Sequence, residues 1–140
     1  MTPDNKVWLR ALPRELRFDL GGRRVLCVHG SPRRINEYLY EDRPEQSLLR
    51  MFRGLGADVI LCGHTHLPYQ RRVGKIGLIN VGSAGKPKDG DPRVMYALIE
   101  FGDEVKTTFL RVEYDVEAAA RAIGATDLPP HFAEALRRVR

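Results

Sequence analysis

The amino-acid sequence predicts one domain of the α/β class over residues 1–140, and three observations lead to this prediction. The 140 residues are 43% hydrophobic and 29% charged, a balance typical of one globular domain that closes its own core. Before residue 67, two short apolar runs flank a helical pattern, which indicates a strand, a helix and a second strand. After residue 68, apolar runs separated by turn residues indicate an antiparallel β meander.

The N-terminal segment predicts a short helix and a hairpin. Thr2 followed by proline is typical of a helix start, and we expect this helix to run to about Leu12, where Pro13 ends it. Two strands, Phe18–Leu20 and Val25–Val28, flank a pair of glycines suited to a tight turn. The second strand is apolar throughout, so we expect it to be buried on both faces.

The strand, helix, strand unit continues from this hairpin. Residues 31–44 are polar and lack a clear period, so we expect an irregular functional loop. A helix is predicted over Pro44–Leu55, where leucines and phenylalanine form one apolar stripe. The apolar run Asp58–Cys62 then predicts a short buried strand that ends at Gly63-His64-Thr65-His66.

The C-terminal half predicts strands and then helices. The expected strands cover residues 69–73, 76–81, 94–101 and 105–114. Asp115 is placed to cap a helix over Val116–Ile123, and a proline pair opens a last helix that runs through Val139.

Charge and cysteine content limit the classes of partner. The chain carries 23 basic and 18 acidic residues, a net charge of +5. The basic residues are scattered, so nucleic acid is not favoured, and anionic small molecules are the expected partners. No apolar run has the roughly 20 residues needed to cross a bilayer, and no secretory signal opens the chain, so we expect a cytoplasmic protein without membrane contact. Cys27 and Cys62 lie in apolar strands and are expected to be reduced.

The main functional signal is the placement of three of the four histidines. His29, His64 and His66 directly follow two predicted buried strands, whose ends can bring side chains together while the sheet holds them. A lone histidine after a strand is usually structural, and we assign that role to His131. The joint placement of the other three favours a metal site. In an extended segment, His64 and His66 would project to the same side.

These motifs carry a resemblance to a known family. Val28-His29-Gly30-Ser31-Pro32, Leu61-Cys62-Gly63-His64-Thr65-His66 and Ile79-Asn80-Val81-Gly82-Ser83 resemble the last metal-binding motifs of calcineurin-like metallophosphoesterases. Within that superfamily the chain is similar to the small bacterial and archaeal phosphodiesterases, a branch that includes the retromer scaffold subunit. The similarity runs from about Arg24 to Tyr114.

The resemblance implies a four-layer αββα sandwich and a site for two divalent metal ions, Mn²⁺, Fe²⁺ or Zn²⁺. By position in the motifs, His29 and His64 would bind one ion and His66 the other. Two such ions activate water and neutralise the charge that develops at phosphorus. The implied function is hydrolysis of phosphodiesters or nucleotides. Arg33 and Arg34 are candidates to bind the substrate phosphate, with a solvent-facing loop as the equal alternative.

The chain also departs from the family. Its first three motifs, Asp-x-His, Gly-Asp-x-x-Asp and Gly-Asn-His-Asp or Glu, supply the carboxylate ligands, and none occurs here. We therefore expect the chain to be the C-terminal half of the domain and inactive alone, since three neutral imidazoles do not offset the repulsion of two cations. The expected partner is a separate N-terminal half or a second copy of the chain.

Two alternatives remain open at this point. Cys27, His29, Cys62 and His64 together offer the ligand set of a structural zinc site. The second alternative is that the chain is a non-catalytic scaffold, which keeps the fold and binds another protein.

Overall fold

The computed structural model describes residues 1–139 and contains four helices and seven strands within that range. In chain order they are α1 (Pro3–Ala11), β1 (Glu15–Leu20), β2 (Arg23–Val28), α2 (Glu45–Phe52), β3 (Val59–Cys62), β4 (Tyr69–Val73), β5 (Ile76–Asn80), β6 (Val94–Phe101), β7 (Val105–Val112), α3 (Val116–Gly124) and α4 (His131–Arg137). The predicted elements are confirmed in type and order. The differences in their bounds are confined to the element ends, which sequence patterns define least well.

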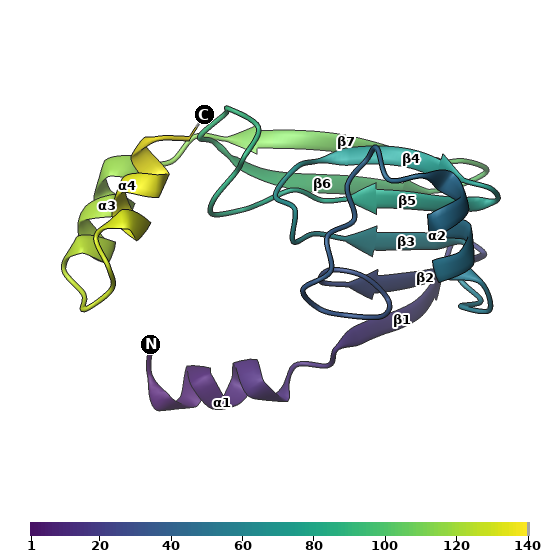
Figure 1. Ribbon diagram of the computed structural model, residues 1–140, viewed down its shortest axis with the longest axis horizontal. Coiled ribbons are helices and arrows are strands. Elements are labelled where there is room, and N and C mark those ends of the chain that lie inside the picture. Colours follow the sequence, from purple (N-terminus) through teal and green to yellow (C-terminus); the bar gives the residue numbers. More distant parts are fainter. Residues whose placement is uncertain (140) are drawn as a thin grey trace.

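A five-stranded sheet in the order β1-β2-β3-β5-β4 forms the centre of the molecule (Figure 1). β2, β3 and β5 run parallel, and β1 and β4 pair antiparallel at the two edges. The register places Leu26 beside Ile60 and Ile60 beside Leu78. Because the three parallel strands end at the same edge of the sheet, the loops that follow them lie together there.

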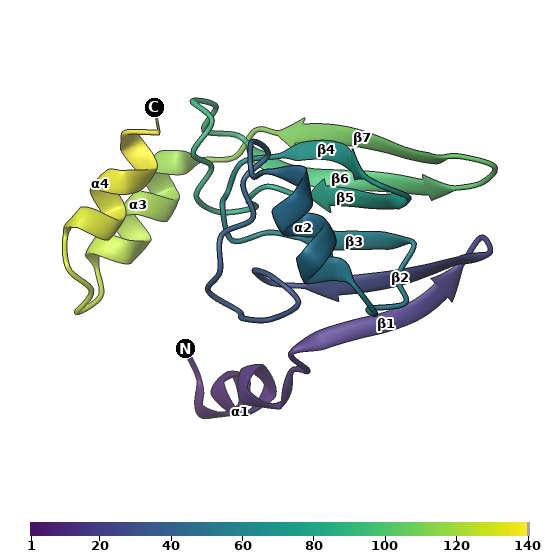
Figure 2. The ribbon, with the colours of Figure 1, turned by 45° about the vertical axis from the view of Figure 1, so that its right-hand side comes forward.

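The sheet is covered on both faces. On one face α2 packs over a core that includes Leu26, Ile60 and Leu78, all fully buried (Figure 2). On the other face Val59 and Ile79 pack with apolar residues of β6 and β7. Adjacent residues of one strand therefore enter different cores, which explains why β3 and residues Val25–Val28 of β2 are apolar.

The expected antiparallel meander is wrong in one respect. β6 pairs with β7 in a separate two-stranded sheet, and β5 pairs with β3 rather than with β6. The physical reason lies in the apolar pattern. β5 buries Leu78 on one face and Ile79 on the other, which suits a central strand, whereas β6 alternates between buried and exposed positions and covers the sheet with one side.

Two helical parts stand away from this body, on the side toward which β2, β3 and β5 point (Figure 1). α1 is capped by the Thr2 hydroxyl, as predicted, but it buries none of its residues. α3 and α4 form a hairpin held by Ala120, Ala133 and Leu136. Over residues 1–139 the layers are therefore α2, the large sheet and the β6–β7 sheet. No helix in this range is long and apolar enough to cross a membrane.

Candidate metal centre

Two histidine nitrogens meet at the edge where the parallel strands end. The Nε2 atom of His29, just after β2, lies 3.1 Å from the Nδ1 atom of His64, just after β3. The backbone joins the same two loops, because the Gly63 N–H donates to the His29 carbonyl at 2.9 Å. His29, His64 and His66 all line one open pocket of about 430 Å³. The structure thus brings together the three histidines that the sequence singles out.

The backbone at His64 and His66 is not extended, so the simple alternation expected for this segment is wrong. Both residues adopt a left-handed conformation, with φ of 65° and 63°. A tight turn is the cause, since the Thr65 N–H donates to the Gly63 carbonyl at 2.7 Å. Left-handed backbone at a residue other than glycine costs on the order of 1 kcal/mol or more and persists only where neighbouring groups fix it.

Asn80, at the end of β5, is the group that fixes this turn. Its side-chain amide is fully buried and donates to the Gly63 carbonyl and to the Thr65 hydroxyl, both at 2.9 Å. Its side-chain oxygen accepts from the Gly82 N–H at 3.0 Å. Thr65 is therefore held inward at 1% exposure, and the histidines on either side of it turn toward the pocket.

His66 has its ring orientation set by a backbone carbonyl. Its Nδ1 lies 2.5 Å from the carbonyl oxygen of Lys86, in the loop after β5. A carbonyl only accepts hydrogen bonds, so this Nδ1 carries the proton and Nε2 keeps its lone pair. Histidines that bind metals commonly have this arrangement, in which the second nitrogen is fixed by an outer partner.

The electrostatics of the pocket favour the neutral form of His29. Partial burial lowers the pKa of His29 below its usual value, and the neighbouring His64 and His66 lower it further. A neutral imidazole retains a lone pair, which metal coordination requires.

The His29–His64 pair fits one metal ion in part. An ion bound at the usual 2.0–2.1 Å from each nitrogen, with the nitrogens 3.1 Å apart, would have an N–metal–N angle of about 95–100°. That angle suits neighbouring ligands. However, among residues 1–139 no three histidine, cysteine or acidic side chains are grouped closely enough to hold a metal ion. The described chain therefore offers imidazoles without the carboxylates that a dinuclear centre needs.

Comparison with known proteins identifies the family. Residues 2–104 match the calcineurin-like phosphoesterase superfamily domain. The chain belongs to this superfamily. It is 31% identical over 150 residues to an uncharacterized protein of Methanocaldococcus jannaschii, covering 95% of this chain and 59% of that protein. It is 33% identical over 99 residues to a probable metallophosphoesterase of Methanothermobacter thermautotrophicus, covering 71% of this chain and 53% of that protein.

The structural comparison agrees with this phosphoesterase assignment. The crystal structure of a metallophosphoesterase from Sphaerobacter thermophilus matches 100% of this chain and 64% of its own, with a TM-score of 0.82 and 26% identity. The chain thus spans between 53% and 64% of the length of these three proteins. The family match covers the N-terminal part of the chain, so it does not support the expectation that the chain is only the C-terminal half of the domain.

The alternative zinc site of the two cysteines and two histidines is not formed. Cys62 packs into the core beneath α2, whereas Cys27 packs on the opposite face of the sheet, toward β6 and β7. Burial raises the pKa of Cys62 to about 12, so its thiol stays protonated and does not act as a ligand. The two cysteines are free, as expected.

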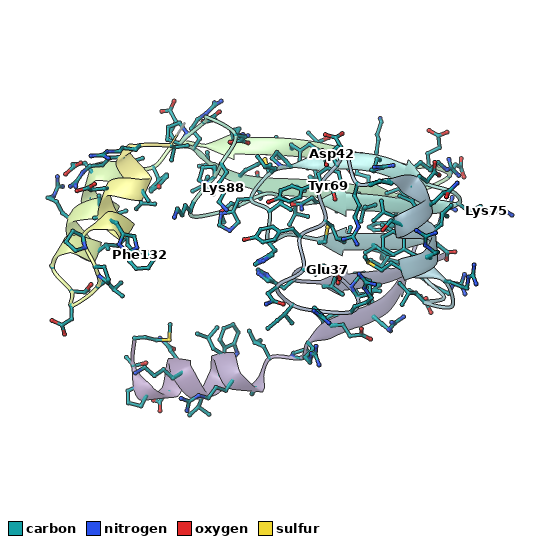
Figure 3. The ribbon with its side chains drawn as sticks, in the orientation of Figure 1. Glu37, Asp42, Tyr69, Lys75, Lys88 and Phe132 are labelled. Atoms are coloured by element: carbon teal, nitrogen blue, oxygen red, sulfur yellow. The ribbon has the colours of Figure 1, made fainter. Side chains whose placement is uncertain are left out.

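The loop over residues 31–44 is ordered by one carboxylate. Glu37 is paired with Arg33 and with Arg43, and its carboxylate accepts from the Ser31 hydroxyl at 2.6 Å. These partners lower the pKa of Glu37 to about 2, with the Arg33 hydrogen bond as the largest cause. Figure 3 shows Glu37 in this loop, beside the end of β2. Arg33 is thus paired within the loop, both Arg33 and Arg34 are exposed, and neither lines the histidine pocket.

Sequence reasoning did not single out two kinds of residue at this site. The structural roles of Asn80 and Thr65 depend on a turn that no periodicity signals, although Asn80 lies in a quoted motif. Tyr38 and Tyr40 lie in the loop, and the Tyr38 ring centroid is 4.3 Å from that of His64. The sequence signal that could have indicated them is the spacing of the two tyrosines, which have one residue between them.

Proposed function

We propose that this chain supplies the histidine side of a dinuclear metal centre that hydrolyses phosphoric esters, with phosphodiesters or nucleotides as substrates, in the cytoplasm. The observation that carries the proposal is the approach of the His29 and His64 nitrogens to 3.1 Å within a calcineurin-like phosphoesterase domain. Divalent ions at such a site lower the pKa of water and neutralise charge on the phosphoryl group.

The roles of the three histidines follow from the hydrogen bonds around them. His29 and His64 would bind one ion, because their facing nitrogens are close enough to coordinate the same metal ion. His66 would bind the second ion through Nε2, because Lys86 fixes the proton on Nδ1. Neutral imidazoles suit Mn²⁺, Fe²⁺ and Zn²⁺, and the two proposed ions are drawn from these three metals.

The carboxylate ligands would come from another polypeptide segment. Within residues 1–139 no acidic side chain joins the histidines in a three-ligand group. The Sphaerobacter thermophilus metallophosphoesterase extends beyond the matched region, which is 64% of its chain. We propose that a segment equivalent to this remainder, on the same or another chain, completes the centre.

Hydrolysis of bis(p-nitrophenyl) phosphate with Mn²⁺ tests the proposal. We expect the 140-residue chain alone to show no rate above that of the metal. Co-expression with the unmatched part of the Sphaerobacter protein should produce turnover that a chelator abolishes. His64→Ala should remove this turnover, and His131→Ala, on α4, should keep it. Turnover by the isolated chain, or turnover that survives His64→Ala, would contradict the proposed division of ligands.

A second candidate function is a non-catalytic scaffold that binds another protein. A different observation favours it, namely that the described residues form no three-ligand metal group. A scaffold would bind its partner equally well after His29→Ala or His64→Ala, and no co-expressed segment would restore hydrolysis. The co-expression experiment therefore separates the two functions.

A further inference from the structure

Two exposed tyrosines stand beside the histidine pair. Tyr38 and Tyr40 are 42% and 45% exposed, while Leu39 between them is fully buried in the core beneath α2. This alternation turns both tyrosine rings to one side of the loop. The two rings are parallel within 2°, with centroids 5.4 Å apart. At that separation parallel rings are offset, so part of each face remains open.

The aromatic rings extend toward the candidate metal centre. The Tyr38 ring lies over the His64 imidazole, with centroids 4.3 Å apart and planes inclined by 34°. The His64 imidazole in turn meets His29 edge-on, with centroids 4.9 Å apart. Tyr40, Tyr38 and His64 therefore form a continuous aromatic surface that ends where a phosphorus atom would be held in the proposed function.

The segment that carries these rings is fixed before any ligand binds. The buried Tyr69 hydroxyl, on β4, donates to the Leu39 carbonyl at 2.7 Å. On the other side, Glu37 is tied to Arg33, Arg43 and Ser31. A binding surface that is already ordered loses little conformational entropy when it binds.

We propose that Tyr38 and Tyr40 form a stacking platform for a planar aromatic ring in the alcohol part of the phosphate ester. The inference rests on the proposed function, because the ester phosphate would lie at His29 and His64. A nucleobase and a simple aryl group share this chemistry. Stacking accepts any flat π face, so the platform selects aromatic over aliphatic esters without reading hydrogen bonds.

Packing alone does not account for the two tyrosines. Leu39 supplies the core contact of this segment, and the residues on either side of it leave 42% and 45% of their surface exposed. Large aromatic side chains left exposed beside a pocket are typical of ligand-binding surfaces. Neither tyrosine lines the histidine pocket, but Tyr38 contacts His64, which does, and the role follows from this contact.

Ligand titration followed by ¹⁹F NMR tests the platform directly. The chain is labelled with 3-fluorotyrosine, and the Tyr38 and Tyr40 signals are assigned with Phe variants. Adenosine 5′-monophosphate, phenyl phosphate and ribose 5-phosphate are the three probes, with Mn²⁺ present. We expect the first two to shift these signals and to bind at least tenfold more tightly than ribose 5-phosphate.

Variants separate stacking from other causes. Tyr40→Leu should weaken binding of the aromatic probe about tenfold, in line with the cost of losing one stacked base, and leave ribose 5-phosphate unchanged. Tyr40→Phe should retain the affinity. Tyr96→Leu is the matched control, because Tyr96 is 49% exposed on β6. Binding of adenosine 5′-monophosphate but not phenyl phosphate would assign the platform to nucleobases, and the reverse would assign it to aryl groups.

Equal affinity for all three probes, or an equal loss for Tyr96→Leu and Tyr40→Leu, would overturn the inference. Binding is read without turnover. A ring preference that persists while the co-expression assay shows no hydrolysis would overturn the proposed function alone. Hydrolysis without a ring preference would overturn the platform alone.

Discussion

At the scale of single residues, the histidine turn depends on one buried amide. Asn80 makes three hydrogen bonds that connect Gly63, Thr65 and Gly82, and each of them stabilises the left-handed backbone next to it. A buried donor or acceptor that loses its partner costs about 1–3 kcal/mol. The buried Asn80 side chain therefore fixes the orientation of the imidazoles, although it does not itself line the pocket.

Asn80→Ala should lower the free energy of unfolding by about 2 kcal/mol, because the Gly82 N–H loses its acceptor and the Gly63 carbonyl and the Thr65 hydroxyl each lose one of two donors. Urea unfolding followed by circular dichroism measures this loss. The control is Asn36→Ala, at an exposed loop position, for which we expect a change within about 0.5 kcal/mol. Equal effects of the two variants would show that the Asn80 bonds do not stabilise the turn.

Glu37 should make the loop sensitive to acid. Its pKa is about 2 in the folded chain, below the usual carboxyl value, so its stabilising contribution is present above about pH 4.5 and is lost as the pH falls toward 2. We expect Glu37→Gln to cost about 1–2 kcal/mol at pH 7 and about a quarter of that at pH 2.5. Urea unfolding at several pH values measures the difference. Glu104→Gln, on the exposed turn between β6 and β7, is the control.

The positions of the histidines could be predicted from the sequence, but the local geometry of the turn could not. Neighbouring parallel strands end side by side, so His29 after β2 and His64 after β3 are expected to lie near each other. The left-handed backbone at His64 and His66 arises from a bond between Asn80 and residues far from it in sequence. Periodicity describes extended or helical backbone and is silent about such turns.

At the scale of elements, the connection from β2 into the loop depends on a glycine. A Cβ atom at Gly30 would lie 2.6–2.9 Å from the backbone oxygens of Ile35, Glu37 and Arg34. The backbone of the loop therefore approaches closely at Gly30, next to His29. At Gly63 the approach is less close, because an added Cβ would lie 3.7 Å from the His29 carbonyl oxygen, an ordinary contact.

Gly30→Ala should lower the melting temperature by several degrees, since the backbone must move to relieve three contacts at a cost of about 1–3 kcal/mol. Gly63→Ala is the matched control at the end of the neighbouring strand and should change the melting temperature by much less. Differential scanning calorimetry measures both. A larger loss for Gly63→Ala would show that the glycine of the second loop, not the first, limits the approach of the backbone.

Strand order shows the limit of reasoning about elements one at a time. The pattern of each strand predicted its existence, and the hairpins β4–β5 and β6–β7 follow from short glycine-containing turns. The insertion of β5 between β3 and β4 could have been inferred from its apolar residues on both faces. Sequence proximity favoured pairing with β6 instead, and burial outweighed it.

At the scale of the whole molecule, one side of the chain leaves apolar surface uncovered. β1 lies at an edge of the sheet, and all six of its residues are exposed. Leu16, Phe18 and Leu20 are 43–56% exposed, and α1 nearby exposes Trp8 at 63%. Within residues 1–139 the other edge of β1 is unpaired, because β1 pairs with β2 alone. Edge strands with apolar side chains recruit other strands unless they are covered.

The isolated chain should therefore self-associate through β1, or bind the segment that completes the proposed metal centre. Static light scattering over a dilution series should show the average mass rising with concentration. Leu16→Lys should suppress this rise, because a charge on an edge strand opposes pairing. Leu98→Lys is the matched control, since Leu98 is 52% exposed on β6 and Leu16 is 56% exposed on β1. If both variants associate as the unchanged chain does, or if the unchanged chain stays monomeric at all concentrations, β1 is not the contact. The co-expressed segment should suppress self-association too, because both partners would compete for the same edge.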